Sequence, residues 1–325
     1  MNVRDALGGT VYVYNNTLPD VIGSIRLVAF IPARHLGTRA LYFGPELKAE
    51  EFLDAHQPKV LIFTKAFDAS VLELARAALR RDIKIISCFC DLRFSGEVGR
   101  LDGDLLRLSN AVVVPNAWMA NEVLQRFGKR SAIIEDVFEY PRRTASFAPE
   151  RPLKVLWFGH SANHDTLIEG IKALLAARLG SIDLVAVTYP QPELDELDAL
   201  MKQNQFKVTY ISWSHLVQHE AFDWCDLVFL PSIDAWEKRM KSHNRLVEAI
   251  NSGRLAIAYP LPQYQELAEF CLCDEDYGRS IRTAVADPLA MLKRIEAGQR
   301  YIDGRFAPEV VARKWRELIT SVSNS

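Results

Sequence analysis

Long apolar runs, a cysteine framework and an excess of one charge are all missing from this sequence of 325 residues. No uninterrupted apolar stretch reaches the ~18 residues that a membrane-spanning helix needs. The beginning, MNVRDALGGTVYVYNN, lacks the apolar core of a signal peptide, and we therefore expect a cytoplasmic protein. Basic residues number 39 and acidic residues 41, so the broad positive charge of a general nucleic-acid binder is missing and we expect no nucleic-acid partner.

The five cysteines match neither a zinc clip nor a disulfide framework. Cys88 and Cys90 form one C-x-C pair, and Cys271 and Cys273 form another, both within stretches that predict strands. This spacing places each pair on one face of a strand and differs from the C-x-x-C of zinc sites. We expect reduced, largely buried thiols.

Three motifs of common enzyme classes are also absent. No G-x-G-x-x-G follows a predicted strand, which removes the fingerprint of dinucleotide binding. No G-x-x-x-x-G-K-[ST] loop occurs, which argues against a P-loop NTPase. The G-x-S-x-G elbow of α/β-hydrolases is missing as well.

Short apolar stretches alternate with amphipathic ones along the whole chain, in a composition that is 49% hydrophobic. A continuous apolar strand between amphipathic helices is typical of a parallel sheet covered on both faces. Strands are predicted at residues 10–14, 58–65, 83–89, 111–115, 153–159, 182–188, 206–212, 225–231 and 254–260.

A break in this alternation divides the chain. Residues 139–152 contain three prolines and no apolar periodicity, which indicates a linker. The sequence therefore predicts an α/β fold of two doubly wound, Rossmann-like domains, residues 1–140 and 153–325, facing across a cleft. The last helical stretch, residues 306–319, packs either on its own domain or on the first, and the sequence leaves this open.

A helix predicted over residues 241–250 carries a polar stripe at the spacing i, i+3, i+4, i+7. The stripe consists of Lys241, Asn244, Arg245 and Glu248. Because this helix follows a strand, its N-terminus is expected at the carboxyl edge of the sheet, where open α/β folds bind ligands and phosphate is favoured. We interpret Lys241 and Arg245 as diphosphate-binding, Glu248 as ribose-binding and Asn244 as orienting either group. An amphipathic helix with a solvated charged face is the alternative.

The order of features in this half resembles the donor half of family-4-type glycosyltransferases. Pro231 and Ser232 end a strand, a K-x-x-N-R-x-x-E helix follows, and a Gly–Arg step leads to a strand with a proline-containing exit loop. Gly159 stands where that family has a glycine after the first strand of the domain. The first half fits more weakly, through GSIR, LIFTK and ISCFCD.

The resemblance implies a GT-B fold and transfer of a hexose-like group from a nucleoside diphosphate sugar to a glycan or lipid-linked glycan, as in polysaccharide biosynthesis. It also implies retention of the anomeric configuration, with no cofactor and no obligatory metal. The glutamate of the helix would hold the ribose, and Gly159, Ser161 and Tyr259 would border the nucleotide sugar. Metal-binding D-x-D patterns occur at residues 102–104 and 274–276, and their chance recurrence gives them little meaning.

Two features depart from the family's pattern. The family has two glutamates eight positions apart, and eight before Glu248 stands Met240. The family also has an arginine and a lysine after the first strand of the domain, where this chain has His160 and His164. His160 is a candidate for contacting phosphate or sugar, with helix capping as the alternative. The phosphate charge would then be met by other cations, namely Lys238, Arg239, Lys241 and Arg245.

Candidates in the first half are fewer. Asp91 ends the strand ISCFCD at the carboxyl edge, where it would serve as a base or as an anchor for an acceptor hydroxyl, and a turn cap is the alternative. Gly23 opens a helix whose backbone amides would face a phosphate. Residues 93–104 contain three glycines and predict a mobile loop on the acceptor side.

Two rival functions fit the same pattern. A sugar-nucleotide epimerase uses the same architecture, and a catalytically inactive glycan- or partner-binding relic would explain the loss of the glutamate at Met240. His215 and His219 are spaced i, i+4 but lack an H-E-x-x-H motif, which favours a surface helix over a metal site. Peripheral membrane contact and oligomeric state are left open by the sequence.

Overall fold

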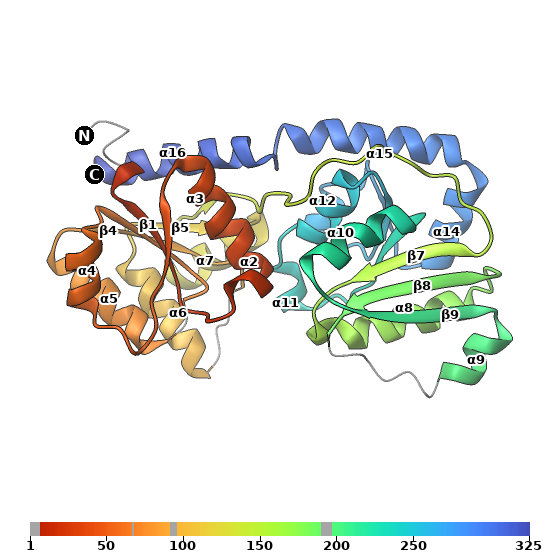
Figure 1. Cartoon of the computed structure of the whole chain (residues 1–325), viewed down its shortest axis with the longest axis horizontal. Coiled ribbons are helices and arrows are strands. Elements are labelled where there is room, and N and C mark those ends of the chain that lie inside the picture. The colour runs from red at the N-terminus through yellow and green to blue at the C-terminus, as the bar shows by residue number, and fades with distance from the viewer. Residues whose placement is uncertain (1–6, 67, 92–95, 190–196) are drawn as a thin grey trace. The chain divides into compact units, whose positions relative to one another are not determined.

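The structure, a computed structural model, describes residues 7–66, 68–91, 96–189 and 197–325 (Figure 1). These residues form two compact units. The first comprises the described residues up to Glu139 together with Arg239–Ser242 and Arg305–Ser325, and the second comprises Tyr140–Lys238 and His243–Gly304. Each unit holds one parallel sheet of six strands with helices on both faces. The predicted fold class, two Rossmann-like α/β layers, is confirmed.

The first sheet has the strand order β2-β1-β3-β4-β5-β6. Its strands are β1 (Thr10–Tyr14), β2 (Arg39–Tyr42), β3 (Val60–Thr64), β4 (Lys84–Cys88), β5 (Ala111–Val114) and β6 (Ala132–Ile133). The four inner strands are those that the apolar runs predict. The two edge strands, β2 and β6, are short and partly exposed, and no apolar run marks them.

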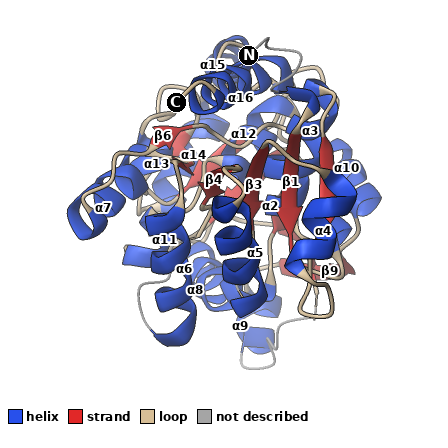
Figure 2. Cartoon of the chain, turned by 90° about the vertical axis from the view of Figure 1, so that its left-hand side faces the viewer, coloured by secondary structure: helices blue, strands red, loops and turns tan. Residues whose placement is uncertain are grey.

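Helices cover both faces of the first sheet. They are η1 (Pro19–Val21), α2 (Gly23–Ile25), the π-helical turn η2 (Arg26–Phe30), α3 (Ile31–Leu36), α4 (Ala49–His56), α5 (Ala69–Arg80), α6 (Gly96–Leu108), α7 (Ala117–Phe127) and α16 (Pro308–Ser323). Figure 2 shows β1, β3 and β4 side by side with helices around them. Because side chains alternate along a strand, Val11 belongs to the core under α4 and α5, whereas Tyr12 belongs to the core under α3 and α16.

The first helical stretch contains a π turn ahead of Pro32. In a regular α-helix the ring of Pro32 would meet the carbonyl of Val28, and its missing N–H would leave that carbonyl without a partner. The wider turn accommodates the ring, and the N–H of Ile31 donates to the carbonyl of Arg26 instead. The helix predicted to begin after Gly23 is therefore present, with this one irregular turn.

The sequence predicts a mobile loop over residues 93–104. From Gly96 onward this prediction is wrong, because these residues form α6. Residues 92–95 lie outside the described part of the chain. Leu105 and Leu106 of α6 are buried, and Gly103 allows the helix to approach Phe127 of α7 closely. Burial of the apolar face outweighs the low helix propensity of glycine.

The C-terminal helix α16 belongs to the first unit. Trp315 is buried and meets the ring of Tyr12 edge to face, with 5.6 Å between the ring centroids. Glu135 accepts from Arg305 Nε at 2.8 Å and from Lys314 Nζ at 2.6 Å. Burial raises the pKa of Glu135, but the two cations outweigh burial and the net shift is downward. These contacts settle the packing that the sequence leaves open.

The second sheet has the strand order β12-β11-β10-β7-β8-β9. Its strands are β7 (Leu153–Phe158), β8 (Ile182–Thr188), β9 (Phe206–Ser212), β10 (Leu227–Leu230), β11 (Leu255–Ala258) and β12 (Leu272–Cys273). Five of the six coincide with predicted strands. The sixth, β12, is a two-residue edge strand that lies in the strand stretch predicted around Cys271 and Cys273.

The helices in the second half of the chain are η3 (Ser161–Asn163), α8 (His164–Ala176), α9 (Asp198–Gln203), α10 (His215–Trp224), α11 (Trp236–Arg239), α12 (Asn244–Asn251), α13 (Pro262–Gln265), α14 (Tyr277–Ala286) and α15 (Pro288–Asp303). One face of the second sheet shares a core with α8, α14 and α15. The opposite face carries α10, since Phe158 of β7 meets Phe222 of α10 edge to face.

The proline-rich stretch after Glu139 docks against the end of α12. Helix α12 ends in a Schellman motif, in which Gly253 has φ +66° and donates to the carbonyl of Ile250, while Arg254 donates to that of Ala249. This confirms the predicted role of Gly253. A β-carbon at Gly253 would lie 2.4 Å from the carbonyl oxygen of Thr144, so the glycine also makes room for this stretch.

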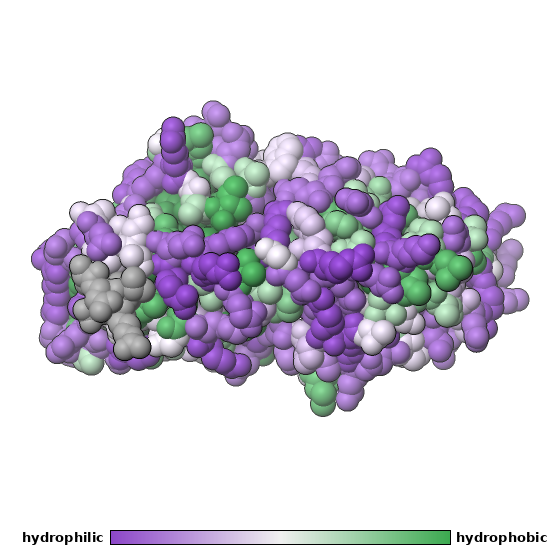
Figure 3. Space-filling view, turned by 90° about the horizontal axis from the view of Figure 1, so that it is seen from above, coloured by the Kyte–Doolittle hydropathy of each residue, from purple (hydrophilic) through white to green (hydrophobic). Residues whose placement is uncertain are grey.

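Polar side chains predominate on the face of the molecule seen in Figure 3, where hydrophobic residues form small separate patches. Among the described residues, no helix has both the length and the apolar character to cross a membrane.

Gly253→Ala should destabilise the second unit strongly, because alanine is strained at positive φ and its β-carbon would meet the Thr144 carbonyl. Gly180→Ala is the matched control, since Gly180 has φ +83° but its β-carbon would make only ordinary contacts. We expect a loss of about 1–2 kcal/mol for the control and roughly 2–5 kcal/mol for Gly253→Ala. Urea unfolding measures both, and equal losses would contradict the docking of this stretch.

Candidate functional site

The carboxyl edge of the second sheet gathers polar side chains around Gly159, directly after β7. A β-carbon at Gly159 would lie 3.0 Å from the Trp157 ring and 3.5 Å from Nη1 of Arg245. Glycine thus leaves room for the guanidinium at the end of the strand. The structure brings together Gly159 and Arg245, which the sequence predicts as parts of one site.

Arg245 lies in the first turn of α12. In the part of the chain that the structure describes, its Nη1 is buried and makes no hydrogen bond. A buried guanidinium nitrogen without a partner costs free energy unless a ligand supplies an acceptor. Arginine donates in a planar fork that matches phosphate or carboxylate oxygens. Arg245 is therefore poised to bind an anion.

Lys238, in the single turn of α11, is the second cation of this edge. Its Nζ donates to Oδ1 of Asn163 at 2.6 Å, and its carbonyl accepts from Nε2 of Gln263 at 2.8 Å. Burial lowers the pKa of Lys238, and the positive charge of Arg245 lowers it further, against the opposing effect of Asp165. We call Lys238 and Arg245 the cation pair.

The histidines of the HSANH segment have structural partners. Nδ1 of His160 accepts from the backbone N–H of Ala162 at 3.1 Å and caps η3, with the hydroxyl of Ser161 beside it at 3.5 Å. Nε2 of His164 lies 2.8 Å from Oγ1 of Thr188 at the end of β8. Burial, and then the charge of His160, lower the pKa of His164. His160 therefore caps a helix, which is the alternative to ligand contact that the sequence left open. It is an exposed residue that follows Gly159 directly.

The predicted helix over residues 241–250 is too long at its beginning. Helix α12 starts at Asn244, so Lys241 lies outside it and does not share a stripe with the later residues. Asn244, Arg245 and Glu248 remain on α12, and Glu248 is almost completely buried, with 2% of its surface exposed. A buried carboxylate on this helix can accept hydrogen bonds from ligand hydroxyl groups.

The segment after β11 contributes Tyr259, which lies in the loop, and Gln263, which lies in the short helix α13. The hydroxyl of Tyr259 donates to Oε1 of Glu275 at 3.1 Å, and burial followed by this carboxylate raises the pKa of Tyr259. Gln263 is fully buried and supports the backbone of Lys238. Sequence reasoning missed Gln263 and Asn163, whose only signal is that each follows a predicted strand by a few residues.

Asp91 belongs to a different cluster, in the first unit. One carboxylate oxygen pairs with Nζ of Lys65, which follows β3 with φ +50°, and the other pairs with Nζ of Lys241. The sequence predicts Asp91 as a base or hydroxyl anchor, but the structure commits both oxygens to lysines. Lys241 thus belongs to an ion-pair cluster with Asp91 and Lys65. It does not lie on α12 beside Arg245, as the predicted stripe would have it.

Gly23 begins the helical stretch of the first unit, as predicted. A β-carbon there would have only Nη2 of Arg26 within 4 Å, at 3.8 Å. The guanidinium of Arg26 binds Glu139 through two hydrogen bonds of 2.6 and 3.0 Å and the carbonyl of Asp20 at 2.6 Å. The basic residue next to Gly23 is therefore engaged by protein acceptors.

Neither D-x-D pattern forms a ligand cluster. Asp102 and Asp104 lie within α6, where Asp104 pairs with Arg107, while Asp274 pairs with Arg279 and Asp276 caps α14. In residues 7–66, 68–91, 96–189 and 197–325, no group of three His, Cys, Asp or Glu side chains could hold a metal ion. All five cysteines are free thiols and four are buried. His215 and His219 pack instead on the ring of Tyr140, with ring centroids 4.7 and 5.1 Å away.

Several solved structures are similar to this chain over almost its whole length. HepE from Anabaena, in complex with UDP, has a TM-score of 0.69 at 13% identity, covering 96% of this chain and 99% of that one. The catalytic domain of starch synthase IV from Arabidopsis thaliana, bound to ADP and acarbose, has a TM-score of 0.70 at 12% identity, with 97% and 99% covered. AviGT4, a glycosyltransferase involved in avilamycin A biosynthesis, has a TM-score of 0.63 at 13% identity, with 97% and 98% covered.

The chain has the GT-B fold. No protein-family model matches the sequence, and no curated protein matches it either. At these identities the likeness shows the fold alone. The chemistry of this GT-B protein therefore depends on its own residues. Among them, the cation pair contains a buried guanidinium nitrogen that a ligand could satisfy.

If the cation pair binds an anion, its affinity should weaken at alkaline pH. A lysine whose pKa is lowered loses its charge at a lower pH than an ordinary lysine, so affinity for an anion should fall as pH rises through that lowered pKa. Lys238→Arg should abolish the fall, because arginine stays charged.

Sulfate is a suitable probe, because its own charge is constant in this range, and its stabilising effect on thermal unfolding reports binding. An alkaline loss of the same size in the wild type and in Lys238→Arg would rule out Lys238 as the titrating group.

Proposed function

We propose that this protein is a glycosyltransferase, which moves a sugar from a nucleoside diphosphate sugar to a glycan or lipid-linked glycan acceptor. The observation that carries the proposal is the cation pair at the carboxyl edge of the second sheet, in which a buried arginine nitrogen has no protein acceptor. The GT-B fold supports the proposal, and so do two similar structures with this fold, one of which holds UDP and the other ADP.

The donor would bind through two sets of groups. Lys238 and Arg245 face the diphosphate, with Gly159 leaving space for it and His160 and Ser161 beside it. Glu248 accepts hydrogen bonds from the ribose hydroxyls, and Asn244, in the first turn of the same helix, orients one of these groups. Tyr259 borders the sugar from the loop after β11.

Catalysis would rest mainly on stabilising the leaving group. The bond between the anomeric carbon and the diphosphate oxygen breaks, and negative charge develops on that oxygen. Two fixed cations oppose this charge in the transition state without having to reorganise. They supply the positive charge that a divalent cation would otherwise provide, and we accordingly propose a metal-independent reaction.

The proposed stereochemistry is retention. In this mode the acceptor oxygen bonds to the anomeric carbon on the face that the leaving group vacates, and the acceptor proton passes to the departing phosphate. No protein base is needed. Inversion would require one, and Asp91, the candidate that the sequence suggests, has both oxygens paired with lysines.

A nucleoside diphosphate should bind tightly, and its affinity should depend on Arg245. Arg245→Met should weaken binding about tenfold to hundredfold, because the diphosphate loses a charged donor in a buried position. Lys172→Met is the control, since Lys172 is an exposed cation on α8 paired with Glu169. Titration calorimetry with UDP, ADP and GDP measures the affinities.

Equal affinity in the wild type and Arg245→Met would remove Arg245 from the site. Failure of the wild type to bind any nucleoside diphosphate would instead favour the inactive relic.

The transferred sugar should keep its anomeric configuration, and turnover should persist in the presence of EDTA. The proton coupling constant at the anomeric carbon of the product, measured by NMR, gives the configuration directly. An inverted product would overturn the retaining mechanism. Incubation of the donor without an acceptor tests the epimerase alternative, which predicts an isomerised nucleotide sugar, whereas a transferase leaves the sugar's stereochemistry unchanged.

A further inference from the structure

Two cysteines at the edge of the second sheet have their sulfur atoms in contact. Cys273 ends β12, and Cys271 directly precedes this strand. Their sulfurs lie 3.3 Å apart, and one thiol donates a hydrogen bond to the other sulfur. Both residues belong to the second unit. We call Cys271 and Cys273 the thiol pair.

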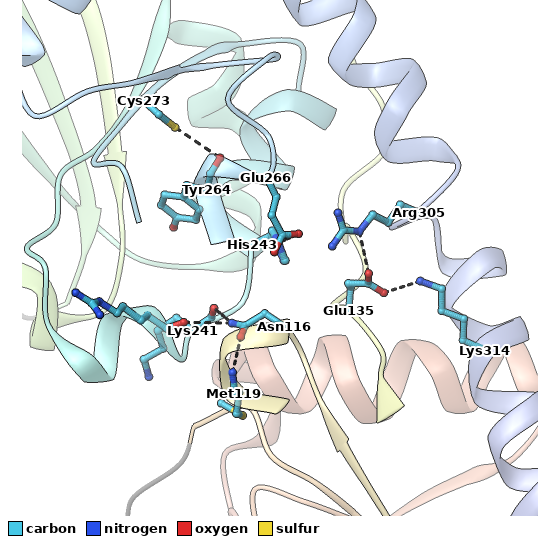
Figure 4. A network of polar contacts seen from close by, with 11 residues as sticks. Asn116, Met119, Glu135, Lys241, His243, Tyr264, Glu266, Cys273, Arg305 and Lys314 are labelled. Carbon is cyan, nitrogen blue, oxygen red and sulfur yellow. Dashed lines mark hydrogen bonds and ion pairs between the residues drawn. The ribbon is translucent and has the colours of Figure 1, made fainter. Parts of the chain in front are cut away.

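Hydrogen bonds within the second unit hold the thiol pair in place. Sγ of Cys273 lies 3.6 Å from the carbonyl oxygen of Tyr264 (Figure 4). Sγ of Cys271 lies 3.3 Å from the carbonyl oxygen of Leu267. Nη1 of Arg294, on α15, donates to the backbone carbonyl of Cys271 at 2.6 Å. Both the sulfurs and the backbone that carries them are therefore fixed by neighbouring groups.

The two thiols differ in exposure and in acidity. Cys273 is half-buried, whereas Cys271 is completely buried. The hydrogen bond from Cys271 lowers the pKa of Cys273, burial opposes this shift, and the positive charge of Arg294 adds to it. The same contact, followed by burial, raises the pKa of Cys271. Because the thiolate is the reactive form of cysteine, Cys273 is the nucleophile of the pair.

The C-x-C spacing alone does not produce this arrangement. Cys88 and Cys90 have the same spacing in the first unit, but both are buried. Over its described residues, the structure has no hydrogen bond between these two sulfurs. Burial raises the pKa of Cys88 well above its usual value. Sulfur contact, partial exposure and a lowered pKa thus occur together in the thiol pair and not in the other C-x-C pair.

We propose that the thiol pair is an oxidation site, at which a peroxide converts Cys271 and Cys273 into a reversible disulfide. The thiolate of Cys273 attacks one oxygen of hydrogen peroxide, and the O–O bond breaks to give a sulfenic acid and hydroxide. The sulfur of Cys271 then attacks the sulfenic sulfur, and the S–O bond breaks as water leaves with the thiol proton. The two thiols supply the two electrons that reduce the peroxide to two molecules of water.

Disulfide formation requires only a small movement of the side chains. A disulfide bond is about 2.05 Å long, so the two sulfurs must approach one another by roughly 1.2 Å. The carbonyls of Leu267 and Tyr264 lose thiol donors, which are weak ones. The hydrogen bond from Arg294 should remain, because it is made to the backbone of Cys271 and not to its sulfur.

Peptide mapping of the full chain tests the proposal. The folded protein is treated with a small excess of hydrogen peroxide, the remaining thiols are blocked with iodoacetamide, and trypsin then releases residues 85–93 and 255–279. Each of these peptides contains both cysteines of one C-x-C pair. Mass spectrometry should find a disulfide within 255–279 that dithiothreitol reverses, formed at least about tenfold faster than any oxidation of 85–93.

Two further measurements assign the roles. In concentrated urea the two peptides should oxidise at equal rates, because the sulfur contact and the lowered pKa are properties of the folded chain. Cys271→Ser removes the second thiol, so a sulfenic acid should accumulate on Cys273 and react with dimedone. Cys273→Ser should be oxidised about tenfold more slowly than the wild type, since the remaining thiol is buried and its pKa is raised.

Equal oxidation of the two peptides in the folded wild type would overturn the proposal, and so would the absence of a disulfide within 255–279. A disulfide between two chains, seen as a dimer on a non-reducing gel, would contradict it as well. If a variant fails to fold, the comparison of the two wild-type peptides decides. The result is independent of the proposed function, because neither nucleotide nor acceptor is present.

Discussion

Two like charges held close together are the constraint on which the account of this protein depends. Burial and, after it, the charge of Arg245 lower the pKa of Lys238, and Nη1 of Arg245 is buried without a hydrogen bond among the described residues. Such an arrangement is unfavourable by itself, because burial and mutual repulsion both disfavour the charged forms. An anion of two or more charges would relieve both costs. The fold helps to maintain the arrangement, because Asn163 binds the ammonium group of Lys238, Gln263 binds its carbonyl, and hydrogen bonds from Gly253 and Arg254 close the end of α12.

Much of the fold could be predicted from the sequence, because buried parallel strands consist of continuous runs of apolar residues. β1, β8 and β9 have the predicted bounds, and the other predicted strands differ by one to three residues at their ends. Edge strands such as β2 and β6 could not be found in this way, since a short strand that is half exposed has no distinctive pattern. The helix α6 was missed because its glycines suggest a loop, whereas its stability comes from tertiary packing.

The candidate site was predictable only where local pattern governs structure. That Gly159 lies near Arg245, and that Arg245 and Glu248 share one helix, could be predicted because a glycine after a strand and a helix stripe are local signals. The position of Lys241 was wrong because helical spacing continues through residues 241–243, yet Asn116 and Asp91 hold this segment in the first unit. Both partners are more than a hundred residues away in the sequence, and no periodicity reports such contacts.

A crystal structure of the protein with bound UDP or ADP would test the central claim most directly. The account predicts that oxygens of the diphosphate lie about 3 Å from Nζ of Lys238 and Nη1 of Arg245, at the carboxyl end of β7. A nucleotide bound elsewhere, with this cation pair facing only solvent or protein, would contradict it.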